Sequence, residues 1–190
     1  MRSHALFGAV LAVVMPASSA AVPPALGITS ADVNRIQQSW CQSFLEIGAA
    51  FRRSGISQAR ALAEAFVDTT YGYARGPVAF KPTFASGSQT FRPTREGAIA
   101  YFVGANSRYP NDRGSALKTW ASCRVSNHSI QLYGSYAAVM GQMTLVDQEG
   151  VAITLDQTWG FLLQEPGDIR IVLHHSSLPF QPPTSADAAR

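Results

Sequence analysis

The sequence has few charged residues and few sulfur or lysine side chains. Charged residues make up 14% of the 190 residues, hydrophobic residues make up 46%, and only two cysteines and two lysines are present. This composition excludes an intrinsically disordered chain, because disorder requires low hydrophobicity and a high net charge. The net charge is +3 and the arginines are scattered without a basic run, so the sequence lacks the electrostatic footprint of a nucleic-acid-binding protein.

The sequence also lacks an apolar run of the ~20 residues that a membrane-spanning helix needs. A shorter apolar run, residues 5–15, follows Arg2 and precedes the small residues Ser18, Ser19 and Ala20. This order is typical of a cleavable signal peptide over residues 1–20. We therefore expect a soluble protein, periplasmic or secreted, with no membrane partner.

Two cysteines are too few for a zinc ribbon or a haem attachment site. Export permits a disulfide between Cys41 and Cys123. We nevertheless favour two free, buried cysteines, because such side chains behave as small hydrophobic residues.

The patterning predicts one domain at residues 29–180, preceded by a mobile leader at 21–28 and followed by a flexible tail at 181–190. Thr29 and Ser30 offer capping oxygens to a helix that Gly55 ends, and a second helix runs from Ser57 to about Tyr71. Thr94 caps a short third helix. Strands are expected at 77–84, 89–92, 115–127, 129–146, 151–164 and 169–177. Helices followed by an antiparallel meander indicate an α+β fold in which a curved sheet encloses an apolar cavity.

A polar block, His174 to Ser177, closes the last apolar strand. Alternation sends His174 and Ser176 to one face and His175 and Ser177 to the other. Because neighbouring histidines then point apart, one metal ion cannot easily bind both, and a zinc or manganese site is possible but disfavoured. His128 is expected in a solvated turn. Asp68 and Asp156 are candidates for the carboxylate base that an isomerase or cyclase would need.

Several segments resemble the iota-class carbonic anhydrases, over about residues 28–180: 71–83, 91–102, 109–114, 158–161 and 173–179. The resemblance implies the cone-shaped fold shared with nuclear transport factor 2 and the association domain of calmodulin-dependent kinase II. It also implies reversible hydration of carbon dioxide to bicarbonate, and a homodimer. Metal use divides the family, and the histidine geometry favours the metal-free form here, with no cofactor.

Thr83 and Tyr101 match the family's threonine and tyrosine, and one histidine and one serine of the block at 174–177 match the remaining pair. We favour His175 with Ser177, in phase with Ile171 and Leu173; a bulge in the strand would instead select His174 with Ser176.

The matched residue types suit this chemistry. The hydroxyls could orient bicarbonate oxygens, and a histidine could accept the proton lost by the attacking water. The alternative function is a non-catalytic module of the same fold that binds a small ligand or assembles into oligomers, because a fold alone does not fix a function.

Overall fold

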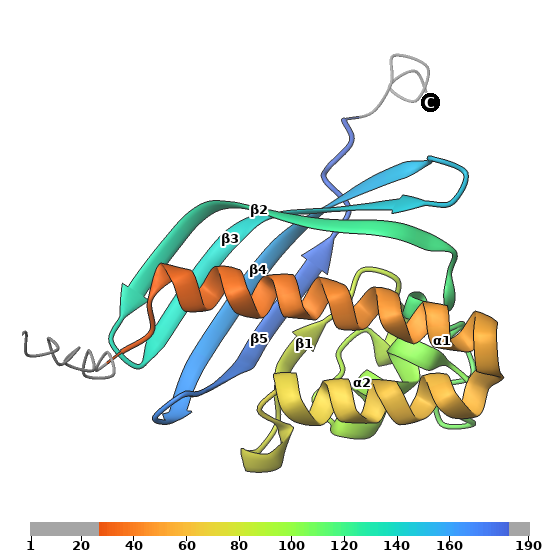
Figure 1. Cartoon of the computed structure of the whole chain (residues 1–190), viewed down its shortest axis with the longest axis horizontal. Coiled ribbons are helices and arrows are strands. Elements are labelled where there is room, and N and C mark those ends of the chain that lie inside the picture. Colours follow the sequence, from red (N-terminus) through yellow and green to blue (C-terminus); the bar gives the residue numbers. More distant parts are fainter. Residues whose placement is uncertain (1–26, 183–190) are drawn as a thin grey trace, which may run out of the picture.

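The computed structural model describes residues 27–182, in which a curved five-stranded sheet packs against helices on one face (Figure 1). The helices are α1 (Ser30–Thr70) and α2 (Arg95–Val103), and three short 3₁₀ turns are η1 (Tyr73–Arg75), η2 (Gly87–Gln89) and η3 (Ser115–Leu117). The strands are β1 (Ala79–Lys81), β2 (Trp120–Tyr133), β3 (Tyr136–Asp147), β4 (Ala152–Glu165) and β5 (Asp168–Ser177). This arrangement confirms the α+β fold class. The proposed signal peptide and the end of the tail lie outside the described residues.

Helix α1 begins at the predicted cap and folds back on itself at the predicted glycine. The Thr29 hydroxyl accepts a hydrogen bond from the Asp32 backbone N–H, and the Asp32 carboxylate accepts one from the Thr29 backbone N–H. Together the two bonds form a capping box. Gly55 has φ of 77°, a left-handed value that glycine adopts without steric cost. The two arms, 30–54 and 56–70, therefore run antiparallel (Figure 1). No helix within residues 27–182 has the length and apolarity to cross a bilayer.

The sheet has the strand order β1-β5-β4-β3-β2. Four strands form the expected antiparallel meander, whereas β1 pairs in parallel with β5. The predicted strand at 89–92 is wrong: Gln89 ends η2, and the segment meets β1 through the Arg92 N–H, which donates to the Phe80 carbonyl at 2.8 Å, and the Pro93 carbonyl, which accepts from the Val78 N–H at 3.4 Å. Pro93 has no N–H with which to continue a ladder.

The predicted break near residue 128 is also wrong. Strand β2 runs through His128 to Tyr133, and the turn follows at Gly134, which has φ of 68°. A register shift between Asn127 and Ser129 marks a β-bulge, which inserts one residue and leaves pairing intact on both sides. The first part of the predicted strand at 115–127 forms η3 instead.

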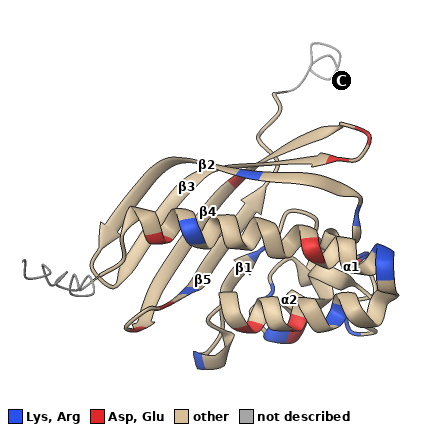
Figure 2. Cartoon of the chain, in the orientation of Figure 1, with Lys and Arg blue, Asp and Glu red and all other residues tan. Residues whose placement is uncertain are grey.

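The core consists largely of aromatic rings held between α1, α2 and the sheet. The Trp40 ring lies against four rings, one from the second arm of α1 and three from other elements, with centroids 5.6–6.2 Å apart: Phe66, Phe102, Trp159 and His174. Helices α1 and α2 carry many of the charged residues, and long stretches of the strands carry none (Figure 2). The apolar inner face of the sheet is therefore matched to an aromatic layer, and a polar side chain there requires a local partner.

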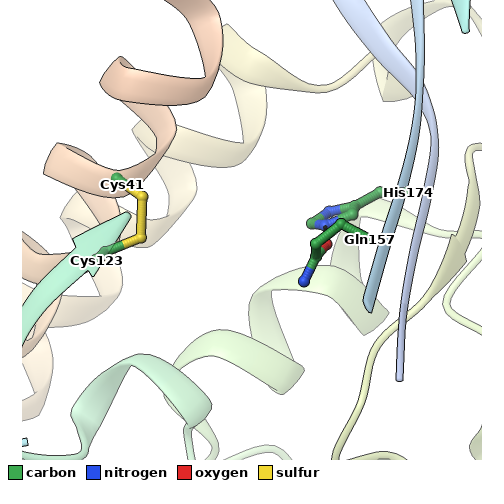
Figure 3. Close-up of a disulfide and its surroundings, with 4 residues drawn as sticks. All are labelled: Cys41, Cys123, Gln157 and His174. Atoms are coloured by element: carbon green, nitrogen blue, oxygen red, sulfur yellow. Dashed lines mark hydrogen bonds between the residues drawn. A yellow bond between two sulfur atoms is a disulfide. The ribbon is translucent and has the colours of Figure 1, made fainter. Parts of the chain in front are cut away.

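A disulfide joins Cys41 of α1 to Cys123 of β2 (Figure 3). The preference for free cysteines is therefore wrong. Periodicity placed one cysteine on a helix and the other on a strand, but only the packing of α1 across β2 brings their Cα atoms to 5.4 Å. The bridge fastens the long helix to an edge strand of the sheet.

Breaking this bridge should lower stability. The cysteines lie 82 residues apart in the sequence, and loss of a native disulfide typically costs about 2–5 kcal/mol. We expect that loss in urea unfolding of the Cys41→Ser/Cys123→Ser double variant, and of the parent protein in reductant. The double variant itself should be insensitive to reductant. Identical midpoints for the parent protein with and without reductant would contradict the bridge.

Candidate functional site

A bulge in β5 decides which residues of the His-His-Ser-Ser block face the core. Gly160 of β4 pairs with Leu173 and the next residue, Phe161, pairs with Ile171, so Val172 is the extra residue. The bulge shifts the alternation by one position. His174 is accordingly 2% exposed and Ser176 6% exposed, so the favoured orientation of His175 and Ser177 toward the interior is wrong.

The structure brings the other matched hydroxyls to the same place. Thr83 follows β1, which lies beside β5, and its hydroxyl donates a hydrogen bond of 2.8 Å to Ser176 Oγ. Tyr101 lies on α2 and is 8% exposed. Thr83, Tyr101, His174 and Ser176 are thus assembled from three places: the end of β1, α2 and β5. His175, in contrast, is exposed on the outer face of the sheet.

A small cavity lies at the centre of this group. Its polar lining is Tyr101, Ser115, Gln157, His174 and Ser176, and the rest of its wall is apolar or aromatic. The volume within which the centre of a water molecule can move is about 20 Å³, which is enough for one water. The cavity therefore suits a very small molecule with a few polar contacts.

An outer cleft adjoins this cavity. Phe84, Tyr101 and Ser115 line both spaces, and the cleft has a volume of about 390 Å³. Arg113 and Lys118 also line it, and Lys118 Nζ lies 4.6 Å from the centroid of the Phe84 ring. Asp112 lines the cleft as well, but its carboxylate pairs with Arg92 at 2.8 Å, so the charged lining of the cleft is positive on balance.

Hydrogen bonds of 2.9 Å connect His174 to α1 and β4. The Trp40 indole N–H donates to the Tyr71 hydroxyl, the Tyr71 hydroxyl meets His174 Nδ1, and His174 Nε2 meets Gln157 Oε1. Because an indole nitrogen only donates, the Tyr71 oxygen accepts that bond and its own proton points to Nδ1. His174 is then the neutral tautomer with hydrogen on Nε2, which it donates to Gln157.

The basicity of His174 is low in this setting. Burial, with a smaller contribution from neighbouring His175, lowers its pKa to about 3. A ring with that pKa and both nitrogens engaged is not a proton acceptor near neutral pH, so it does not fill the proton-accepting role expected of a histidine. Burial raises the pKa of Tyr101 to about 12, which keeps its hydroxyl protonated and able to donate.

Neither predicted carboxylate reaches the cavity. Asp68 forms an exposed ion pair with Arg95, with an oxygen–nitrogen distance of 2.8 Å. Asp156 lies on the outer face of the sheet, where it accepts a hydrogen bond from Gln142 at 3.1 Å. An isomerase or cyclase mechanism would therefore lack its base. Among residues 27–182, no three His, Cys, Asp or Glu side chains are grouped as a metal site would require.

Gln157, Tyr71 and Trp40 were missed as site residues. The sequence carries a signal for Gln157: it falls between Leu155 and Trp159 in the inward phase of an alternating strand, where an apolar residue is expected. Tyr71 and Trp40 gave no such signal, because their aromatic rings fit a core role equally well.

The sequence and the fold of this chain are similar to those of proteins from one family. The family model described as metal-independent carbonic anhydrase matches residues 31–178. A metal-independent carbonic anhydrase of Nostoc sp. is 43% identical over 154 residues, which cover 81% of this chain and 75% of that protein.

Solved structures agree. A cyanobacterial iota-carbonic anhydrase complexed with bicarbonate superposes with a TM-score of 0.81 at 39% identity, covering 90% of this chain and 100% of the other. A putative calcium/calmodulin-dependent protein kinase II association domain from Xanthomonas campestris has a TM-score of 0.52 at 16% identity, covering 87% of this chain and 97% of the other. The second likeness shows the fold alone.

The buried, neutral His174 should make stability depend on pH. Its pKa is about 3 in the folded chain against an ordinary 6.5, so between these values the unfolded chain binds a proton that the folded chain does not. Stability should therefore fall as the pH falls, by about 2 kcal/mol between pH 7 and pH 5. Urea unfolding at several pH values measures this slope. His174→Gln should flatten it and the exposed-site variant His128→Gln should retain it; a parent protein equally stable at both pH values would refute the assignment.

Proposed function

Because the chain belongs to the metal-independent carbonic anhydrase family, we propose that it catalyses the reversible hydration of carbon dioxide to bicarbonate in the cavity between α1, α2 and the sheet. One observation carries the proposal: the hydroxyls of Tyr101 and Ser176, far apart in the sequence, line one small cavity with His174, and Thr83 is hydrogen-bonded to Ser176. An oligomerisation module has no need of such a cluster.

The proposed reaction uses both the apolar and the polar side chains of the cavity wall. Carbon dioxide is apolar and fits between the aromatic rings. A water oxygen attacks its carbon, one carbon–oxygen π bond opens onto oxygen, and the water loses a proton to give bicarbonate. The Tyr101 and Ser176 hydroxyls donate hydrogen bonds to the oxygen on which charge develops, and donors fixed before the reaction stabilise that charge strongly.

The departing proton needs a route to solvent that does not pass through His174. The hydrogen-bonded pair of Ser176 and Thr83 offers one, because a hydroxyl both accepts and donates. Ser176 lines the cavity and Thr83 is partly exposed. In this proposal the bond reverses as the water is deprotonated: Ser176 accepts a proton from the water and gives its own to Thr83, which gives one to solvent. Tyr101 then remains the hydroxyl that donates to the charged oxygen.

We also propose that no metal takes part. The description of the matching family supports this, as does the engagement of both His174 nitrogens by Tyr71 and Gln157, which leaves that ring no free lone pair for zinc or manganese. Export to the periplasm or the exterior after cleavage behind Ala20, and a homodimer, complete the proposal; they rest on the sequence pattern and on the family resemblance.

Chelation should leave the hydration activity intact. The test is stopped-flow hydration of carbon dioxide by the protein after treatment with a strong chelator, with and without added zinc or manganese. We expect equal rates in all samples. Loss of activity that returns with either metal would overturn the metal-free mechanism, and a parent protein without hydration activity would overturn the function.

Removing single hydroxyls should slow hydration far more than it destabilises the fold. Tyr101→Phe and Thr83→Val preserve shape and each remove one oxygen. A neutral hydrogen bond contributes about 1 kcal/mol to stability, whereas a donor to developing charge such as Tyr101 contributes roughly a hundredfold or more to the rate. Loss of the Thr83 hydroxyl breaks the proposed proton route. We expect rates at least that much lower with small changes in melting temperature. Tyr133→Phe, at a tyrosine 64% exposed, is the matched control; parental rates in both site variants would move the active site elsewhere.

A further inference from the structure

We propose that Gln157 is a further substrate-contacting residue, whose carboxamide nitrogen donates a hydrogen bond to an oxygen of bicarbonate and of the reacting carbon dioxide. We further propose that His174, Tyr71 and Trp40 are positioning residues that hold this amide in place. The inference rests on the proposed function and adds to it a donor beyond the matched hydroxyls.

The first support is position. Gln157 of β4 is the cross-strand partner of Ser176 of β5, and directly opposed side chains have Cβ atoms about 4.5–5.5 Å apart. Both side chains line the cavity, and Gln157 is 3% exposed. The amide therefore lies next to the hydroxyl that the family resemblance already assigns to the site.

The second support is orientation. Because Trp40 only donates, the chain of hydrogen bonds through Tyr71 gives His174 a hydrogen on Nε2, and that hydrogen needs an acceptor. The amide oxygen of Gln157 meets the need, so its nitrogen must point elsewhere. Figure 3 shows that nitrogen directed away from the imidazole ring. A flipped amide would set two N–H donors against each other, which costs free energy in a buried site.

The third support is an unmet donor. None of the residues 27–182 accepts a hydrogen bond from the Gln157 amide nitrogen, although its oxygen is engaged. This nitrogen is accessible from the cavity that Gln157 lines, so a small molecule bound there can accept its hydrogen bonds. Its two N–H groups, with the hydroxyls of Tyr101 and Ser176, form a cluster of donors.

Such a cluster suits a planar oxyanion of single charge. No carboxylate lines the inner cavity, so a bound anion meets no like charge there. Three donors from β4, β5 and α2 can each face one oxygen of a trigonal ligand. Polarisation along the chain from Trp40 to the amide strengthens its donation, and the positive cleft beside the cavity favours the approach of an anion.

A purely structural role for Gln157, as acceptor for His174, makes a different prediction. Gln157→Glu keeps an acceptor oxygen for the His174 N–H but removes the donor and adds a carboxyl group, so a structural role alone predicts activity near that of the parent only where this carboxyl is protonated; the rate is therefore measured over a range of pH. If the amide contacts substrate, hydration should fall about a hundredfold or more, as when one oxyanion donor is lost. Gln157→Met, which adds no charge, should show a loss of the same order. Gln131→Glu, at an exposed glutamine of β2, is the matched control and should leave the rate unchanged.

A binding measurement on the parent protein separates this inference from the function. The side-chain amide resonances of Gln157, assigned by their absence in Gln157→Glu, should shift saturably when bicarbonate is titrated in. Resonances that do not move, or a Gln157→Glu variant as active as the parent, overturn the role of Gln157 while the function stands. A saturable shift in a parent protein that does not hydrate carbon dioxide supports the contact and overturns the function.

Discussion

The extra residue in β5, Val172, sets the direction of every polar side chain that follows it. Without the bulge, His174 and Ser176 would face solvent, and the exposed His175 and the partly exposed Ser177 would enter the core. A single inserted residue reverses the alternation because the side-chain period of a strand is two. The bulge sits opposite Gly160, which has no side chain; a Cβ there would lie 2.9 Å from the Leu173 Cβ. Tight packing at this point therefore maintains the register on which the site depends.

The site joins the helices to the sheet through polar contacts inside an aromatic core. A buried imidazole without partners would be costly, but Tyr71 from the end of α1 and Gln157 from β4 satisfy both nitrogens of His174. Stacking adds to this restraint, since the His174 ring lies 3.8 Å from Trp159 and 5.2 Å from Phe80, centroid to centroid. A ring held on both nitrogens and both faces restrains the donors around it.

The disulfide belongs to the same framework. Cys41 directly follows Trp40, the first donor of the hydrogen-bonded chain, and the bridge to Cys123 fixes that turn of α1 against β2. Catalysis without a metal depends on preorganised donors, because no strong Lewis acid compensates for a donor that is out of place. Restraint of α1 on both sides of the cavity is consistent with that need.

The sequence by itself determined the helices, their caps, the α+β class and the set of residue types at the site. Helix caps, the glycine break at residue 55 and period-two alternation are local properties, so they can be predicted from the order of residues. The family motifs supplied Thr83 and Tyr101. Tertiary structure decided the rest. The bulge at Val172, the pairing of Cys41 with Cys123 and the parallel docking of β1 on β5 depend on contacts between distant segments. The same is true of the Trp40–Tyr71–His174–Gln157 chain: its members span 135 positions, from residue 40 to residue 174 counted inclusively, and only folding shows that the histidine is held neutral while the glutamine presents its amide.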